Sequence, residues 1–126
     1  MKKGLDKIFT LQKNYPFSRM KELYSKNDVL VLTSLHECAN VSICEAMASE
    51  MVAISPDTNG TASYLDEGAG YIYKENDAQD LSQILDDLSL KDAYELSMIG
   101  KTSRKRYEDN YSFRVYKEQL LGHLPK

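Results

Sequence analysis

Residues 29–54 read VLVLTSLHECANVSICEAMASEMVAI, and this stretch decides the fold class. It opens with a continuous apolar run, Val29–Leu32, which predicts a strand that is covered on both faces. A polar loop follows, and apolar residues then recur at helical spacing, which predicts a helix over Ser42–Glu50. Val52–Ile54 predicts a second buried strand. The order strand, helix, strand is typical of a parallel sheet with crossover helices.

The flanking sequence continues this alternation. Upstream, Lys7–Leu11 predicts a short strand and Arg19–Lys26 a short helix. Downstream, the pattern predicts a short helix over Thr61–Asp66, a strand over Gly70–Tyr73, and helices over Asp77–Leu88, Lys91–Asn110 and Ser112–Leu124. We therefore expect an α/β fold, a Rossmann-like parallel sheet with helices on both faces. A single weak strand at the start, with successive helices at the end, indicates that the chain starts part-way through a larger fold.

Length and charge exclude several classes of protein. The 126 residues suffice for one compact domain and leave no room for a second. A net charge of −3 argues against a general polyanion binder, so we expect no nucleic-acid partner. No apolar run approaches the ~20 residues that a membrane helix needs, and no signal peptide is visible. We therefore expect a cytoplasmic location.

The cysteine and histidine residues give no sign of a metal site. Cys38 and Cys44 are six residues apart, a spacing that fits neither a redox pair nor a zinc pair, so we expect reduced thiols. Neither cysteine has a convincing catalytic base nearby in the sequence. His36 and His123 lie far apart and have no partner pattern. We expect neither a bound metal nor a cofactor.

A basic run at Lys101–Arg106 has two interpretations. It could form a patch for an anionic membrane or a nucleic acid. It could instead be the solvated face of a helix, since Glu108 and Asp109 stand beside it. The negative charge of the whole chain favours the solvated face.

The loop and helix between the first two core strands carry the candidate site. Ligands of open α/β sheets bind outside the carboxyl ends of the strands, where Glu37 and Asn40 stand in this chain. Free N–H groups at the start of the following helix suit a diphosphate. Glu37 and Glu45 are eight residues apart and could face one crevice, where carboxylates would hold ribose or sugar hydroxyls. Alternatively, Ser42 and Glu45 form a capping box and Glu37 is a solvated loop acid.

Residues 34–50, SLHECANVSICEAMASE, resemble the signature of the donor-binding domain of retaining GT-B glycosyltransferases, glycosyltransferase family 4. That signature has the form S-x-x-E-G-F-G-x-x-x-x-E-A-M-A-x-G. Shorter segments resemble other parts of the family in the same order: the E-L-Y-x-x-A-D-V lead-in at Glu22–Val29, a glycine loop at Asn59–Thr61, a D-G-x-x-G turn at Asp66–Gly70, a helix at Asp77–Leu88 and the start of a terminal helix at Tyr111–Phe113. The resemblance extends from about Lys7 to Leu121.

The resemblance implies that residues 1–126 are a single partial nucleotide-sugar-binding domain, a truncated GT-B C-terminal domain whose acceptor-binding partner domain is absent. It implies that Glu45 holds the ribose hydroxyls of the donor and that Glu37 is the catalytic carboxylate near the transferred sugar. The other implied donor contacts are the backbone N–H groups of Ala39, Asn40 and Val41, and the neighbouring residues Gly60 and Thr61.

The implied activity is transfer of a hexosyl group, with retention, from a nucleotide-diphosphate sugar to a hydroxyl acceptor, as in polysaccharide biosynthesis. The donor is a substrate, and the resemblance implies no cofactor and no metal. The acceptor, a glycan or a lipid, would bind through the missing N-terminal domain, and a lipid acceptor would bring peripheral membrane contact. The isolated chain is expected to be inactive. Two alternatives stay open: a non-catalytic nucleotide-sugar-binding fragment or subunit, and a nucleotide-sugar epimerase.

Several residues depart from the family pattern. Ala39 and Asn40 replace its Phe-Gly, which alters the backbone approach to the sugar. Glu50 replaces a glycine that often ends this helix, where left-handed geometry favours glycine. If the first units of the sheet are missing, a strand at Lys7–Leu11 would lie near an open sheet edge and favour a homodimer.

Overall fold

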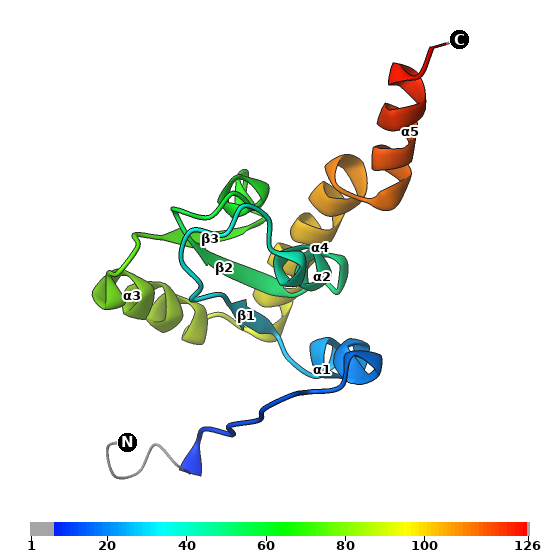
Figure 1. The fold of residues 1–126 in the computed structure, drawn as a ribbon. Helices are drawn as coiled ribbons and strands as arrows, with labels where there is room; N and C mark the ends of the chain where they lie inside the picture. The colour runs from blue at the N-terminus through cyan, green and yellow to red at the C-terminus, as the bar shows by residue number, and fades with distance from the viewer. Residues whose placement is uncertain (1–6, 126) are drawn as a thin grey trace.

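The computed structural model describes residues 7–125 (Figure 1). Three strands, five α-helices and two short 3₁₀ helices follow one another along this part of the chain. In order they are η2 (Phe17–Arg19), α1 (Met20–Ser25), β1 (Val29–Val31), α2 (Val41–Ala48), β2 (Val52–Pro56), η3 (Ala62–Leu65), β3 (Gly70–Tyr73), α3 (Ala78–Ser89), α4 (Ala93–Asn110) and α5 (Phe113–His123).

The strands form one parallel sheet in the order β1–β2–β3. Val29 pairs with Val52 across the first strand pair, and Ala53 pairs with Gly70 across the second. The central strand β2 is buried along its whole length. The predicted parallel α/β arrangement is confirmed, and all three strands direct their carboxyl ends toward one edge of the sheet.

Helices cover both faces of the sheet, as predicted. Alternate residues of β2 face opposite sides because side chains alternate along a strand. Ala53 packs into a cluster with Ile43 and Met47 of α2. Val52 and Ile54 pack into a second cluster, to which α3 contributes its apolar stripe. Helix α4 joins both clusters: its first half contributes Leu96 and Ile99 to the second cluster, and Tyr107 packs against the first.

Strand β1 differs from the prediction that it would be covered on both faces. Val29 and Leu30 are only half-buried, and 37% of the Val31 surface is exposed. The reason is position: in the part of the chain that the structure describes, β1 is an edge strand with a neighbour on one side only. A hollow of about 220 Å³ borders it, with a mainly apolar lining that includes Leu23, Leu30 and Met51.

The predicted strand at Lys7–Leu11 is wrong. This segment runs away from the sheet without strand pairing (Figure 1). Ile8 is 76% exposed and Leu11 is 84% exposed. A strand needs a hydrogen-bonded neighbour, and residues 7–125 supply none for this segment. Within residues 7–125 the edge strands are β1 and β3, and the motive for a homodimer through a Lys7–Leu11 strand is removed.

The end of α2 packs directly on the backbone of α4. Glu50 follows the helix with a φ of 59°, in the left-handed region that the family pattern fills with glycine. A Cβ atom added to Gly100 of α4 would lie 2.0 Å from the Glu50 carbonyl oxygen. Gly100 therefore allows the two backbones to approach more closely than any side chain would permit.

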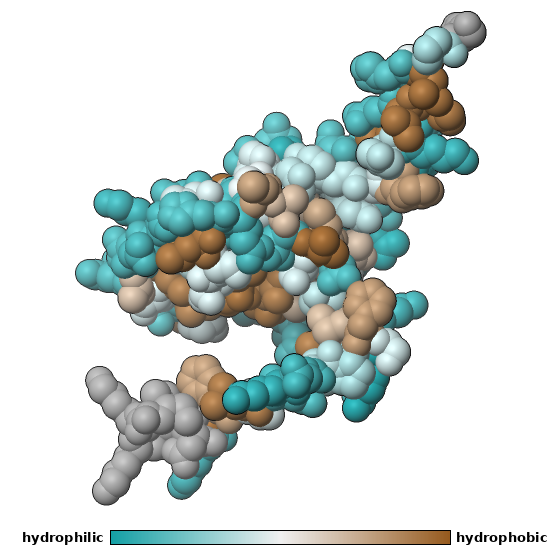
Figure 2. Space-filling model, viewed as in Figure 1, coloured by the Kyte–Doolittle hydropathy of each residue, from teal (hydrophilic) through white to brown (hydrophobic). Residues whose placement is uncertain are grey.

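The last helix extends beyond the body of the molecule. Figure 2 shows apolar side chains gathered on α5, and they are largely exposed (Phe113, Tyr116, Leu120 and Leu121). At its base, the ring of Tyr111 stacks on Tyr64 of η3 with the ring centroids 3.9 Å apart. This stack ties the end of α4 to the segment that follows β2.

Candidate functional site

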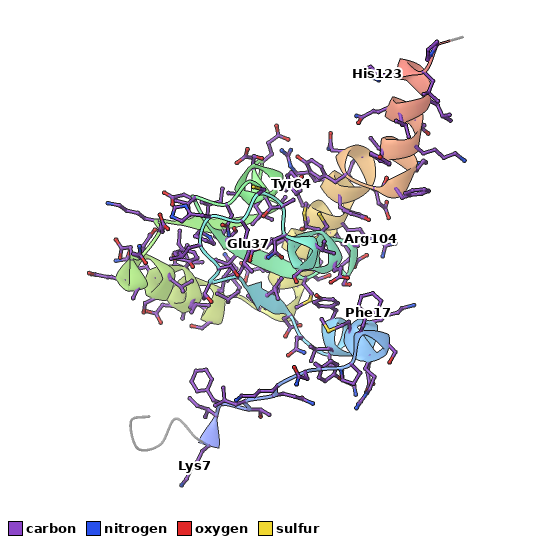
Figure 3. The ribbon with its side chains drawn as sticks, viewed as in Figure 1. Lys7, Phe17, Glu37, Tyr64, Arg104 and His123 are labelled. Atoms are coloured by element: carbon purple, nitrogen blue, oxygen red, sulfur yellow. The ribbon has the colours of Figure 1, made fainter. Side chains whose placement is uncertain are left out.

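Three loops meet at the carboxyl edge of the sheet. The first, residues 32–40, leaves β1 and enters α2, and it carries Glu37 (Figure 3). The second, residues 57–61, follows β2, and the third, residues 74–77, follows β3. Backbone and side-chain hydrogen bonds join the loops. The three loops at the edge where the sequence predicts the site therefore form one connected surface.

Asn59 fastens the second loop to the first. Its side chain is buried, and its Oδ1 accepts a hydrogen bond from the Glu37 N–H at 2.9 Å. Its Nδ2 donates to the Ser34 carbonyl, also at 2.9 Å. The Gly60 N–H adds a bond to the Glu37 carbonyl at 2.8 Å. Sequence reasoning missed the role of Asn59, because an Asn-Gly pair also signals an ordinary turn.

Gly60 sits against the same loop, and Thr61 follows it in the chain. A Cβ on Gly60 would lie 2.0 Å from the Cys38 carbonyl oxygen, so the two loops are in direct backbone contact. Thr61 is fully buried, and its Oγ1 has no hydrogen-bond partner within residues 7–125. The structure thus brings Gly60 next to the loop that carries Glu37, and Thr61 follows it as a buried residue.

Asn40 caps α2 with its own side chain. Its Oδ1 accepts a hydrogen bond from the Ser42 N–H at 2.9 Å, and its Nδ2 donates to Oε2 of Glu37. The alternative of a capping box begun by Ser42 is wrong, since Asn40 occupies the N-cap position. Glu37 is likewise not a freely solvated loop acid, because both its backbone and its carboxylate are hydrogen-bonded.

Glu45 has different neighbours from Glu37. It lies in the second turn of α2, and its Oε2 accepts a hydrogen bond from the Tyr24 hydroxyl of α1 at 2.7 Å. Burial, together with this bond to a carboxylate, raises the pKa of Tyr24. Glu45 lines a hollow of about 350 Å³ between the η2–α1 segment and α2, together with Phe17 and Lys21. The carboxylate thus faces a hollow with an aromatic wall.

The remaining predicted donor contacts lie where the loop enters α2. Ala39 and Val41 flank the Asn40 cap and are exposed, so their backbone stands at the surface of the site. The third loop reaches the first through a contact of 3.2 Å between His36 Nε2 and Glu75 Oε1. His36 has a φ of 56° and stands directly before Glu37 in the chain.

The cysteines match the expectation of free thiols. Cys38 is exposed and Cys44 is half-buried, and neither forms a disulfide. Burial and the nearby Glu45 carboxylate raise the pKa of Cys44, which keeps it protonated and unsuited to act as a nucleophile. No group of three or more His, Cys, Asp or Glu side chains in the described part of the chain could hold a metal ion.

The basic run on α4 consists largely of paired side chains. Arg106 donates hydrogen bonds to the carbonyls of Ser63 and Tyr64, at 3.2 and 2.8 Å, so it anchors η3 to α4. The ion pairs of the run are Arg104 with Glu108 and with Glu50, Lys105 with Asp109, and Arg106 with Glu67. These contacts favour the solvated helix face over a polyanion patch. Within residues 7–125, no helix combines the length and apolar character needed to cross a membrane.

Comparisons with known proteins agree with this architecture. A glycosyltransferase from Rickettsia africae ESF-5 has a similar solved structure, with a TM-score of 0.70 and 21% sequence identity over 79% of this chain. A sucrose-phosphate synthase from Thermosynechococcus elongatus aligns with a TM-score of 0.72 and 23% identity, again over 79% of this chain. These similarities confirm the predicted fold class, which resembles the GT-B glycosyltransferase fold.

The chain spans 27% and 25% of the lengths of these two solved proteins. A search of functionally curated proteins found no match. The family comparison matches residues 2–106 to the family described as glycosyl transferases group 1. Because this match spans most of the sequence, the chain belongs to the group 1 glycosyltransferases.

Proposed function

We propose that this chain is the donor-binding part of a retaining glycosyltransferase that uses a nucleotide-diphosphate sugar. The observation that carries the proposal is the Glu45 carboxylate, held by Tyr24 at the edge of the hollow between α1 and α2. Within residues 7–125, Oε1 of Glu45 accepts no hydrogen bond, so we assign this oxygen to a ribose hydroxyl. Phe17, which is 83% exposed, supplies an apolar surface for a flat base.

The sugar would lie toward the carboxyl edge of the sheet, near Glu37. The backbone of Ala39, Asn40 and Val41, with Gly60 and Thr61 across the loop contact, would border the sugar and the diphosphate. Their part in catalysis would be to stabilise the negative charge that grows on the departing diphosphate. The acceptor would be a hydroxyl of a glycan or lipid, as in polysaccharide biosynthesis, and a hexosyl group would be transferred. Two free cysteines support a cytoplasmic setting.

Replacing Glu45 by glutamine should weaken nucleotide binding. The substitution keeps the shape of the side chain but removes the charge that strengthens a bond to a ribose hydroxyl. We expect a loss of ~1–3 kcal/mol in binding free energy, about 5- to 150-fold in affinity. Isothermal titration calorimetry with UDP, GDP and ADP would measure it.

Glu118→Gln is the matched control, because Glu118 is an exposed carboxylate of α5 paired with Arg114. Its nucleotide affinity should equal that of the unmodified chain. If Glu45→Gln leaves the affinity unchanged while a nucleotide still binds, Glu45 serves only to hold Tyr24, and the assignment of the ribose is wrong.

We further propose that transfer requires the remainder of a glycosyltransferase fold, which would meet this chain at the open edge of β1. Among residues 7–125 this edge has no further strand neighbour and lies beside apolar side chains, and such edges pair with other chains. With the chain alone, a second copy would take this place and give a homodimer. Peripheral membrane contact would come with a lipid acceptor.

The purified chain should show no sugar transfer or donor hydrolysis by itself. Product analysis with labelled nucleotide sugars would test this, with and without a co-expressed amino-terminal half of a group 1 glycosyltransferase. Sedimentation of the same samples would show whether the two parts associate. Turnover by the chain alone would contradict the proposal. A complex that binds donor yet never turns over would identify a non-catalytic subunit instead.

A further inference from the structure

Lys21 is a basic side chain in the hollow that contains Glu45. This hollow of about 350 Å³ has Phe17 and Lys21 on its η2–α1 wall and Glu45 on its α2 wall. Figure 3 shows Phe17 on the side of α1 that faces α2. Phe17 and Lys21 are four residues apart along a continuous helical segment, and residues with this spacing are neighbours on one face. The lysine ammonium therefore reaches the edge of a base that packs against Phe17.

The charge of Lys21 is available to a ligand. Its side chain is exposed, and in the described part of the chain it forms no hydrogen bond or ion pair. The basic residues on either side of it along the chain differ, because Arg19 and Lys26 both pair with Glu22. The acidic residue next to Lys21 is thus already engaged by other cations.

The polar groups of the hollow differ in the hydrogen bonds that they form. An ammonium only donates, an ionised carboxylate only accepts, and a hydroxyl does both. The hydroxyls of Ser18 and Ser49 therefore do not distinguish a donor from an acceptor on a ligand. The Tyr24 hydroxyl already donates to Glu45. Among the described residues that line the hollow, only Lys21 requires an acceptor from its ligand.

The nucleobases differ in the group that they would present to an ammonium. Guanine carries a carbonyl oxygen where adenine carries an amino group, and uracil carries one where cytosine carries an amino group. A carbonyl oxygen accepts a charge-assisted hydrogen bond from an ammonium, which is stronger than a bond between neutral groups. An amino group at the same position is a second donor and forms no such bond.

We propose that Lys21 determines the base specificity of this site and selects a nucleotide whose base carries this carbonyl oxygen, uracil or guanine, over adenine. The inference rests on the proposed nucleotide site at Glu45 and deepens it, because it makes the donor a UDP-sugar or a GDP-sugar and not an ADP-sugar. The base would pack against Phe17 with its carbonyl oxygen toward Nζ of Lys21, while the ribose faces Glu45. Base preference then depends on Lys21, and affinity for the ribose depends on Glu45.

The test compares the unmodified chain with Lys21→Met and Lys21→Arg. Methionine keeps most of the apolar stem but removes the charge and the donors, whereas arginine keeps both. Lys117→Met is the matched control, because Lys117 is an exposed lysine of α5. Melting temperatures confirm that all variants fold.

Isothermal titration calorimetry with UDP, GDP, IDP and ADP measures the affinities. IDP and ADP are the matched pair of ligands, because they share the ribose and the diphosphate and differ by a carbonyl oxygen in place of an amino group. We expect the unmodified chain, Lys21→Arg and Lys117→Met to bind IDP about tenfold more tightly than ADP. Lys21→Met should bind UDP, GDP and IDP about tenfold more weakly than the unmodified chain, with the affinity for ADP unchanged. The affinities for UDP and GDP distinguish the two bases.

Three results would overturn the role of Lys21 and leave the proposed function standing. The first is equal affinity of the unmodified chain for IDP and ADP. The second is a preference for IDP that persists in Lys21→Met. The third is an equal loss of affinity for all four nucleotides in Lys21→Met, which would show that Lys21 contacts the diphosphate. Failure of the unmodified chain to bind any of the four nucleotides would overturn the proposed function, and this inference with it.

Discussion

Replacing Gly100 by alanine is expected to lower the free energy of unfolding by about 1–3 kcal/mol, the usual cost of overpacking. In an exposed helix the same substitution would stabilise, since alanine has the higher helix propensity by about 1 kcal/mol. Here the new Cβ would lie 2.0 Å from the carbonyl oxygen of Glu50, which is backbone and has no rotamer to change. Helices α2 and α4 would have to separate, and both pack on β2.

Gly122 provides the matched control. It lies in α5, and a Cβ added there meets no atom within 4 Å. Gly122→Ala should therefore raise the free energy of unfolding by about 0.5–1 kcal/mol. Urea denaturation of the two variants beside the unmodified chain measures both changes. We expect the two changes in the free energy of unfolding to have opposite signs. Equal changes at the two positions would show that the backbones of Gly100 and Glu50 can move apart without destabilising the fold.

Replacing Gly60 by alanine is expected to separate the two loops that build the candidate site. The added Cβ would lie 2.0 Å from the Cys38 carbonyl oxygen and 2.9 Å from its carbon. This clash is relieved only if the two loops move apart, and that movement lengthens the hydrogen bond from the Gly60 N–H to the Glu37 carbonyl. We expect a loss of about 1–3 kcal/mol in the free energy of unfolding. Nucleotide-sugar affinity should fall as well, because Glu37 is displaced.

Amide hydrogen exchange distinguishes this local effect from general destabilisation. The Glu37 N–H is bonded to Asn59 and should exchange much faster in Gly60→Ala than in Gly100→Ala at matched overall stability. The comparison with Gly100→Ala is informative because both substitutions create a clash of the same size at different places. Unchanged protection of Glu37 in Gly60→Ala would refute the proposed loop displacement.

Local sequence signals predicted much of the fold. Asp77 accepts hydrogen bonds from the N–H groups of Gln79 and Asp80 and so caps the helix that was predicted to start there. Strand β2 is buried throughout, as its apolar residues indicated. Glu50 occupies a left-handed position, which its place in the family pattern suggested. Each of these features depends on a few neighbouring residues, so the sequence contains the needed information.

Features that depend on distant partners were not predictable in this way. Lys7–Leu11 has the composition of a strand, but composition does not show whether a neighbouring strand exists to pair with it. Ser42 and Asn40 are both good N-cap residues, and only the structure shows that Asn40 takes the position. The hydrogen bond of Tyr24 to Glu45 joins residues 21 positions apart. The bond that links Asn59 to Glu37 joins residues 22 positions apart.

The stacked rings of Tyr64 and Tyr111 give this protein an optical signal of its own. The chain has nine tyrosines and no tryptophan, so its near-ultraviolet circular dichroism and its intrinsic fluorescence come mainly from tyrosine. Tyr64 belongs to η3, directly after the loop that contacts Glu37, whereas Tyr111 ends α4. The electronic transitions of two rings whose centroids are 3.9 Å apart couple strongly, and this coupling is lost when the rings separate. Movement of the site loop relative to α4 can therefore be followed in solution without attaching a label.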